Sequence, residues 1–99
     1  MSFKDALKTG KFVVTAEAGP PKGTDIKKII HEVELMKGRI DAINVTDNQS
    51  AVMRINSMSF CKIVLDMGIE PILQMTCRDR NRIGLQSDLL GASILGIKN

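Results

Sequence analysis

One glutamate, Glu17, is the residue of this sequence best suited to act as a general acid. It lies in the segment VVTAEAGPPKG, after an apolar run and before two prolines. A carboxylate at the end of a buried strand is expected to be partly desolvated, which raises its pKa and suits it to proton donation near neutral pH. An ion pair with a nearby Arg or Lys is the alternative interpretation, because perturbed carboxylates are not confined to active sites.

Two threonines follow apolar runs at nearly the same spacing. Thr46 comes 29 residues after Glu17, and Thr76 comes 30 residues after Thr46. This period predicts that all three side chains lie at one edge of the fold. A threonine hydroxyl donates or accepts a hydrogen bond, so Thr46 suits the edge of a heterocycle. Helix capping by the polar residues 47–50 explains the cluster equally well.

Gln74 and the residues after it form a third polar cluster. An unsatisfied buried amide costs about 1–3 kcal/mol, so Gln74 needs either a ligand or a neighbouring strand as its partner. Cys77 has no companion base, because the single histidine, His31, lies off the apolar stripe of its helix. We therefore predict that Cys77 is a buried, inert thiol.

The segment RDRNR, residues 78–82, carries three arginines. Guanidinium groups can bind phosphates or the carboxylates of a partner protein, or they can form ion pairs within the loop. Their alternating spacing predicts that one or two at most contact a ligand or partner, and that Asp79 neutralises another. The sequence has no GxGxxG motif, no Walker loop and no His/Cys set with metal-ligand spacing, so neither a Rossmann site nor a metal site is predicted.

The elements that position these side chains alternate regularly. Apolar runs predict strands at 11–16, 41–46 and 70–76, and apolar residues every three or four positions predict helices at 25–37, 50–67 and 81–95. Gly38, Gly68 and Gly96 follow the three helices, where a glycine suits the left-handed position after a helix end. The order βαβαβα predicts an α/β fold with a parallel sheet.

A closed β/α barrel needs eight such units and roughly 250 residues. The chain has 99 residues. We therefore predict the first three βα units of a (β/α)8 TIM barrel, truncated before strand four, with residues 1–99 as the N-terminal (βα)3 portion of a single barrel domain. A small three-stranded α/β domain is the alternative.

The composition excludes several classes of protein. The net charge is +3 and aromatic residues make up 3% of the chain, which gives little support to nucleic-acid binding. No apolar run approaches the ~20 residues of a membrane span, and the first residues do not resemble a secretion signal. Two cysteines make no disulfide framework. We expect a cytoplasmic protein.

Three segments together resemble the methylenetetrahydrofolate reductases. VVTAEAGPPKG is similar to the first-strand motif of that family, DAINVTDNQS to the second, and GIEPILQMTCRDRNRIGLQSDLLGASILGIKN to the third strand and the helix after it. The run MTCRDRNR followed by LQSDLLGA is similar to the variety found in many anaerobic and acetogenic bacteria. The resemblance covers the chain from about Phe12 to Asn99.

This resemblance implies a barrel that binds FAD at its strand ends and reduces 5,10-methylenetetrahydrofolate to 5-methyltetrahydrofolate in one-carbon metabolism. NADH or NADPH would supply the hydride. Glu17 matches the catalytic glutamate and Thr46 a flavin-contacting threonine. Thr76 belongs to the Thr-Cys pair of the third motif, and we expect it to bind the cofactor together with Thr46 and Gln74. Gln74 stands where better-known members have a histidine, so its contact with the cofactor differs.

The family's remaining flavin and folate residues would lie past Asn99, so the resemblance implies an inactive fragment of an active parent. Relatives of the anaerobic variety imply a partner subunit, and a second copy of the chain is another expected partner. Two other functions remain open at this point. One is a non-catalytic α/β module that binds a protein, and the other is a pterin-dependent methyltransferase barrel, which needs no redox cofactor.

Overall fold

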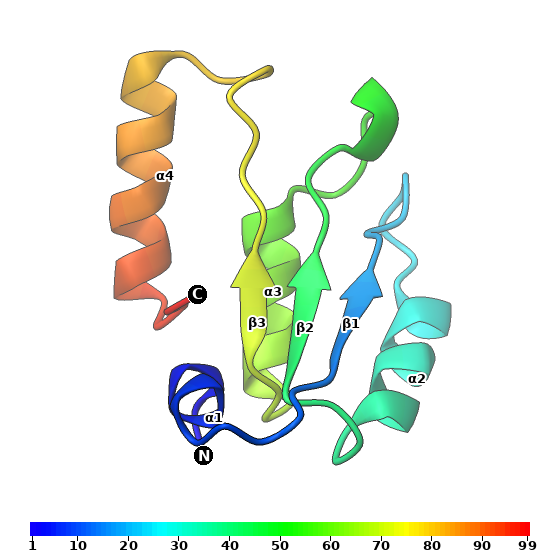
Figure 1. Ribbon diagram of the computed structural model, residues 1–99. Helices are drawn as coiled ribbons and strands as arrows, with labels where there is room; N and C mark the ends of the chain where they lie inside the picture. Colours follow the sequence, from blue (N-terminus) through cyan, green and yellow to red (C-terminus); the bar gives the residue numbers. More distant parts are fainter.

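The computed structural model describes all 99 residues. Its elements alternate between helix and strand along most of the chain (Figure 1). In order they are α1 (Phe3–Lys8), β1 (Thr15–Ala18), α2 (Lys27–Met36), β2 (Ala42–Val45), the 3-10 turn η1 (Gln49–Ala51), α3 (Ser57–Asp66), β3 (Pro71–Leu73) and α4 (Arg82–Ile94).

The three strands form one parallel sheet in the order β1-β2-β3. Helix α3 lies behind the sheet, α2 lies beside β1, α4 lies beside β3, and α1 lies beneath the amino ends of the strands (Figure 1). The opposite face of the sheet carries no helix (Figure 1). The predicted α/β class with a parallel sheet built from βα units is therefore confirmed.

The hydrophobic core lies between the sheet and helices α2 and α3. Its fully buried members are Val33 of α2, Ile43 and Val45 of β2, and Phe60, Cys61 and Val64 of α3.

Gly38, Gly68 and Gly96 all have φ between 82° and 84°, the left-handed conformation predicted for them. No helix is both long enough and apolar enough to cross a membrane.

Two predicted strands have different bounds. The first begins at Thr15 rather than at residue 11, and Phe12 is 89% exposed. Residues 11–13 have no neighbouring strand to pair with, so their β-branched and aromatic composition is not enough to make them a strand. The third strand ends at Leu73, which places Gln74 and Thr76 in the segment after it.

The helix predicted at 50–67 begins seven residues late, at Ser57. Asn48, Ser50 and Ala51 have positive φ, so the chain between β2 and α3 turns instead of continuing as a helix. Asn56 then caps α3 by accepting a hydrogen bond from the Ser59 N–H at 2.8 Å. The capping expected from residues 47–50 is thus wrong.

Helix α1 was not predicted. Ser2 caps it by accepting from the Asp5 N–H, and Gly10 follows it with a φ of 76°. These two residues are the sequence signals of a short helix, but the stretch between them has too few apolar residues to show a periodic pattern.

Candidate functional site

The uncovered face of the sheet collects the polar side chains of the strands. Glu17 of β1 pairs with Asn44 of β2, which pairs with Ile72 of β3. Side chains alternate between the two faces of a sheet, and the neighbouring Ala18 and Val45 belong to the core beneath the helices. Glu17, Asn44 and Ile72 therefore share the face that no helix covers.

Glu17 lies within β1, one residue before its end. Its side chain is exposed and makes no hydrogen bond or ion pair. The partial desolvation expected from the sequence is therefore not found in residues 1–99, and neither is the alternative ion pair. The physical reason is that β1 is an edge strand whose polar face has no covering element.

Thr46 lies directly after β2 and is only 4% exposed. Its backbone N–H donates to Ala18 O at 3.2 Å, which continues the pairing of β1 with β2. Its hydroxyl has no hydrogen-bond partner. A Cβ at Gly19 would lie 3.6 Å from this hydroxyl, so the glycine leaves one approach to it open. A buried hydroxyl without a partner is unusual and suits a ligand that would complete its hydrogen bonds.

Gln74 and Thr76 continue the chain past β3. The Gln74 N–H donates to Val45 O at 3.2 Å and its carbonyl accepts from Ser57 Oγ at 2.8 Å, while its side-chain amide has no partner and is half-buried. The Thr76 hydroxyl is buried and lacks a hydrogen bond of normal geometry. The Gln74 side-chain amide therefore has no partner within the chain, and the Thr76 hydroxyl has only a weak interaction with Asp47.

Asp47 joins the end of β2 to the segment after β3. Its Oδ2 accepts from the Thr76 N–H at 2.8 Å, and both its oxygens accept from the Arg80 guanidinium. Burial opposes ionisation of Asp47, but the hydrogen bonds from Arg80 and from the Thr76 N–H outweigh it and hold the pKa of the carboxyl below its usual range. The Thr76 hydroxyl adds a weaker favourable interaction with the carboxylate.

Arg80 is the centre of this network. Its Nη1 also donates to Thr76 O at 2.9 Å, and its Nε donates to Asp88 Oδ2 of α4 at 2.9 Å. Hydrogen bonds to Asp47 and Asp88 raise the pKa of Arg80 above its already high normal value, so it stays charged. The sequence does not reveal this network, because capping of the next helix is one of the two roles it offers for residues 47–50, and Asp88 lies 41 residues further along the chain than Asp47.

The other arginines of the 78–82 loop behave as surface charges. Arg78 pairs with Asp79 at 2.7 Å and donates to Asn48 O at 2.9 Å, which confirms that Asp79 neutralises one arginine. Arg82 is exposed and forms no ion pair. Ion pairing within the chain therefore accounts for two of the three guanidinium groups.

The prediction for Cys77 is wrong, because its side chain is exposed. The loop after β3 carries it at the surface, beyond the end of the strand that would have buried it. The buried thiol is Cys61 of α3, where burial raises the pKa to about 12. His31 is exposed on α2, as predicted, and offers neither thiol a base.

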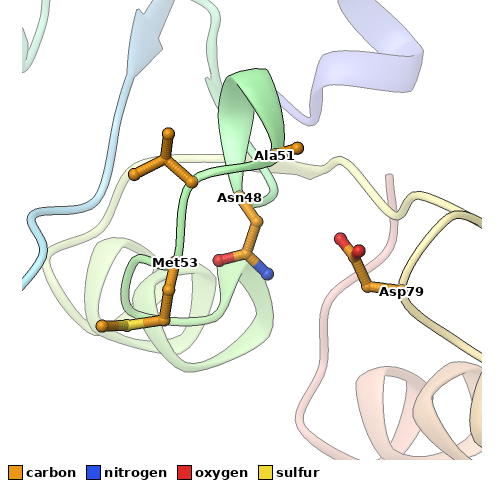
Figure 2. Close-up of a pocket in the computed structure, with 5 residues that line it drawn as sticks. Asn48, Ala51, Met53 and Asp79 are labelled. Atoms are coloured by element: carbon orange, nitrogen blue, oxygen red, sulfur yellow. The ribbon is translucent and has the colours of Figure 1, made fainter.

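A shallow pocket of about 210 Å³ lies beside these loops, with Asn48, Ala51, Met53 and Asp79 around it (Figure 2). It is smaller than the roughly 300–1,000 Å³ of typical ligand pockets, so it does not by itself form a cofactor site. No group of three or more His, Cys, Asp or Glu side chains is arranged to hold a metal ion.

The family model described as methylenetetrahydrofolate reductase matches residues 2–99. No curated protein and no solved structure matches the chain.

Proposed function

Because the chain belongs to the methylenetetrahydrofolate reductase family, we propose that it forms part of an FAD-dependent enzyme that reduces 5,10-methylenetetrahydrofolate to 5-methyltetrahydrofolate. The observation that carries the cofactor assignment is the pair of buried, unpartnered hydroxyls of Thr46 and Thr76. They follow the carboxyl ends of neighbouring parallel strands, which is where β/α barrels bind their ligands.

The fold proposal is the opening (βα)3 portion of a TIM barrel. Both edges of the sheet are open to further strands. The edge of β3 makes one backbone and one side-chain hydrogen bond to Asn99, which follows α4: Leu73 N donates to Asn99 O at 2.8 Å, and Asn99 Nδ2 donates to Pro71 O at 3.2 Å. This contact supports a fourth strand beside β3.

The surface of α4 also supports further units. Ile83, Leu90 and Ile94 form an apolar stripe along the helix and are each at least 70% exposed. Exposed apolar stripes of this kind mark an interface, and the next helix of a barrel would cover this one. The remaining units would complete the site, so we expect no catalysis from residues 1–99 alone.

The residues present fit a flavin. Hydroxyl groups and a side-chain amide can each donate or accept, so Thr46, Thr76 and Gln74 would contact the heteroatoms of the isoalloxazine edge. Gln74 cannot ionise where other family members have a histidine, so it would serve by hydrogen bonding alone. When bound, FAD would accept hydride from NADH or NADPH and pass it to the one-carbon unit of the folate.

Glu17 would supply the proton. On the uncovered face it is free of internal partners, so its carboxyl group is available to a substrate placed over the sheet. As a general acid it would protonate the folate nitrogen while the ring opens to an iminium. Closure of the barrel and binding of the folate would remove water from this face.

The test uses the full-length protein. We expect it to purify with, or to take up, FAD with a flavin absorbance band, to be reduced by NADH or NADPH under anaerobic conditions, and then to be reoxidised by methylenetetrahydrofolate. A protein that binds no FAD contradicts the proposal and favours the protein-interaction module. Methyl transfer from a folate without any electron donor favours the methyltransferase.

A further inference from the structure

Both the backbone N–H and the backbone carbonyl of Thr76 form hydrogen bonds with charged side chains. Its N–H donates to Asp47 Oδ2 at 2.8 Å, its carbonyl accepts from Arg80 Nη1 at 2.9 Å, and Asp47 and Arg80 bind each other. We call these three residues the Thr76 clamp. Thr76 lies three residues past the end of β3, where the sheet no longer supplies hydrogen bonds.

The two charged side chains of the Thr76 clamp are buried. The side chain of Asp47 is fully buried and that of Arg80 is 13% exposed. A buried ion pair contributes little net stability, because desolvation offsets the attraction between the charges. Its stronger effect is geometric, since a bidentate guanidinium fixes distance and direction. The clamp therefore fixes how the ends of β2 and β3 lie relative to each other.

Both unpartnered hydroxyls adjoin this clamp. Thr46 immediately precedes Asp47, and Thr76 is the clamped residue. We propose that Asp47 and Arg80 are positioning residues that hold the Thr76 hydroxyl in place for the flavin. The inference rests on the proposed function, because the ligand it concerns is FAD.

Arg80 does not serve as a direct phosphate ligand in this arrangement. Its Nη1, Nη2 and Nε atoms all donate to groups of this chain. Four of the five N–H groups of its guanidinium are used in this way, and Asp47 and Asp88 already neutralise its charge, so little is left to bind a phosphate. Arg80 therefore acts through Thr76 rather than on the cofactor.

The experiment measures the dissociation constant of FAD from the full-length apoprotein, together with the visible spectrum of the bound flavin. Arg80→Lys keeps the charge but loses the fork that reaches Asp47 and the Thr76 carbonyl at once. The matched control is Arg78→Lys, the same change two residues away, where the arginine pairs only at the surface. We expect Arg80→Lys to weaken FAD binding about 10-fold, the effect of one well-placed hydrogen bond, and Arg78→Lys to change it by less than about twofold.

A double-mutant cycle separates positioning from general destabilisation. Thr76→Val removes the hydroxyl and leaves the backbone contacts of the clamp intact. If Arg80 acts through that hydroxyl, Arg80→Lys weakens FAD binding in the Thr76 protein and has little further effect in the Thr76→Val protein. Asp47→Asn perturbs the clamp from its other side and is expected to show the same dependence on Thr76. Thermal unfolding of each apoprotein verifies that the variants are folded.

Three results would overturn the inference. One is wild-type affinity and spectrum in Arg80→Lys, and another is an equal loss in Arg78→Lys. The third is a loss from Arg80→Lys that is the same with and without the Thr76 hydroxyl, because that shows a structural role. A wild-type protein that binds no FAD overturns the proposed function and this inference together, whereas the three results above leave the proposed function standing.

Discussion

Strand β2 has an aspartate beyond each end, and the two carboxylates make similar contacts in different surroundings. At the amino end, Asp41 accepts from the Val14 N–H at 2.9 Å and pairs with Lys11 at 2.6 Å. At the carboxyl end, Asp47 accepts from the Thr76 N–H and pairs with Arg80. The side chain of Asp41 is 18% exposed and its lysine 45% exposed, whereas the Asp47 pair is almost entirely buried.

The groups around the two aspartates differ as well. The amino end is closed by α1, whose Phe3 N–H donates to Glu70 Oε1 at 2.9 Å, and the polar groups of Asp41 and Glu70 are satisfied there. The carboxyl end has two buried hydroxyls without partners. The same local device, an aspartate that joins neighbouring segments, therefore closes the fold at one end and supports an incomplete polar site at the other.

The largest expected difference between the two ends of the sheet is in the rate of folate reduction, and it concerns Glu17 and Glu70. Glu17→Gln in the full-length protein should slow reduction of the folate by about 10²–10⁴-fold, because the amide keeps the shape but cannot donate the proton. Reduction of bound FAD by the nicotinamide should be unchanged. The control is Glu70→Gln at the amino end, which keeps an oxygen for the Phe3 N–H and should affect neither half-reaction. Stopped-flow measurement of both half-reactions tests this, and equal slowing of the two by Glu17→Gln would show a structural role.

The two aspartates should differ in stability. Asp47→Asn should lower the free energy of unfolding by roughly 2–3 kcal/mol, since it weakens buried hydrogen bonds to a charged group. Asp41→Asn should cost less, because solvent screens its exposed ion pair with Lys11. Urea unfolding at neutral pH measures both, and an equal loss from the two variants would contradict the contrast in burial.

The carboxylates of Asp41 and Asp47 predict that the free energy of unfolding depends on pH. Hydrogen bonds from Lys11 and the Val14 N–H lower the pKa of Asp41 in the folded protein, and the clamp lowers that of Asp47 despite its burial. Their contribution is therefore complete above the unfolded pKa of about 4 and is lost as the pH falls through the lowered folded values. Stability measured from pH 6 downwards should fall less steeply in Asp47→Asn than in the wild type, and an unchanged slope would exclude Asp47 as a contributor.

Substitutions of a glycine at each end of the sheet should affect different properties, stability at the amino end and FAD binding at the carboxyl end. Gly68→Ala at the amino end should lower the free energy of unfolding by about 1–2 kcal/mol, because its φ of 82° disfavours a side chain. FAD affinity should stay the same. Gly19→Ala at the carboxyl end should barely change stability but weaken FAD binding several-fold, because its Cβ would lie 3.6 Å from Thr46 Oγ1. Calorimetry and FAD titration of both variants test this expectation. A loss of FAD affinity in Gly68→Ala together with a loss of stability in Gly19→Ala would contradict it.

The smallest expected effect concerns the thiols. Cys77, exposed in the loop after β3, should react with a thiol reagent in the native protein, whereas Cys61 should react only after unfolding, because burial raises its pKa to about 12. Cys77→Ser should leave activity within about twofold, as expected of a surface substitution. Mass spectrometry of the labelled native protein identifies the reactive thiol, and labelling of Cys61 there would contradict its burial.

The alternation of strands and helices follows from the amino-acid sequence alone. β-branched runs, apolar stripes and the three glycines are local signals, and each acts within a few residues of the place it specifies. For that reason the parallel α/β class, helices α2 and α4, and the left-handed glycines were all predicted correctly. The motif around Glu17 and the Thr-Cys pair likewise pointed to the family whose model matches residues 2–99.

The strand ends and the polar contacts depend on the tertiary structure. Residues 11–13 have strand-like composition but no strand beside them, and Glu17 is exposed because nothing covers the face on which it lies. The clamp joins Asp47 to Arg80, 33 residues away, so no local pattern could reveal it. Strand pairing, the covering of a sheet face and the burial of a side chain all depend on which segments the fold brings together. In the case of Asp47, these contacts make the residue hold the ends of β2 and β3 in place instead of capping a helix.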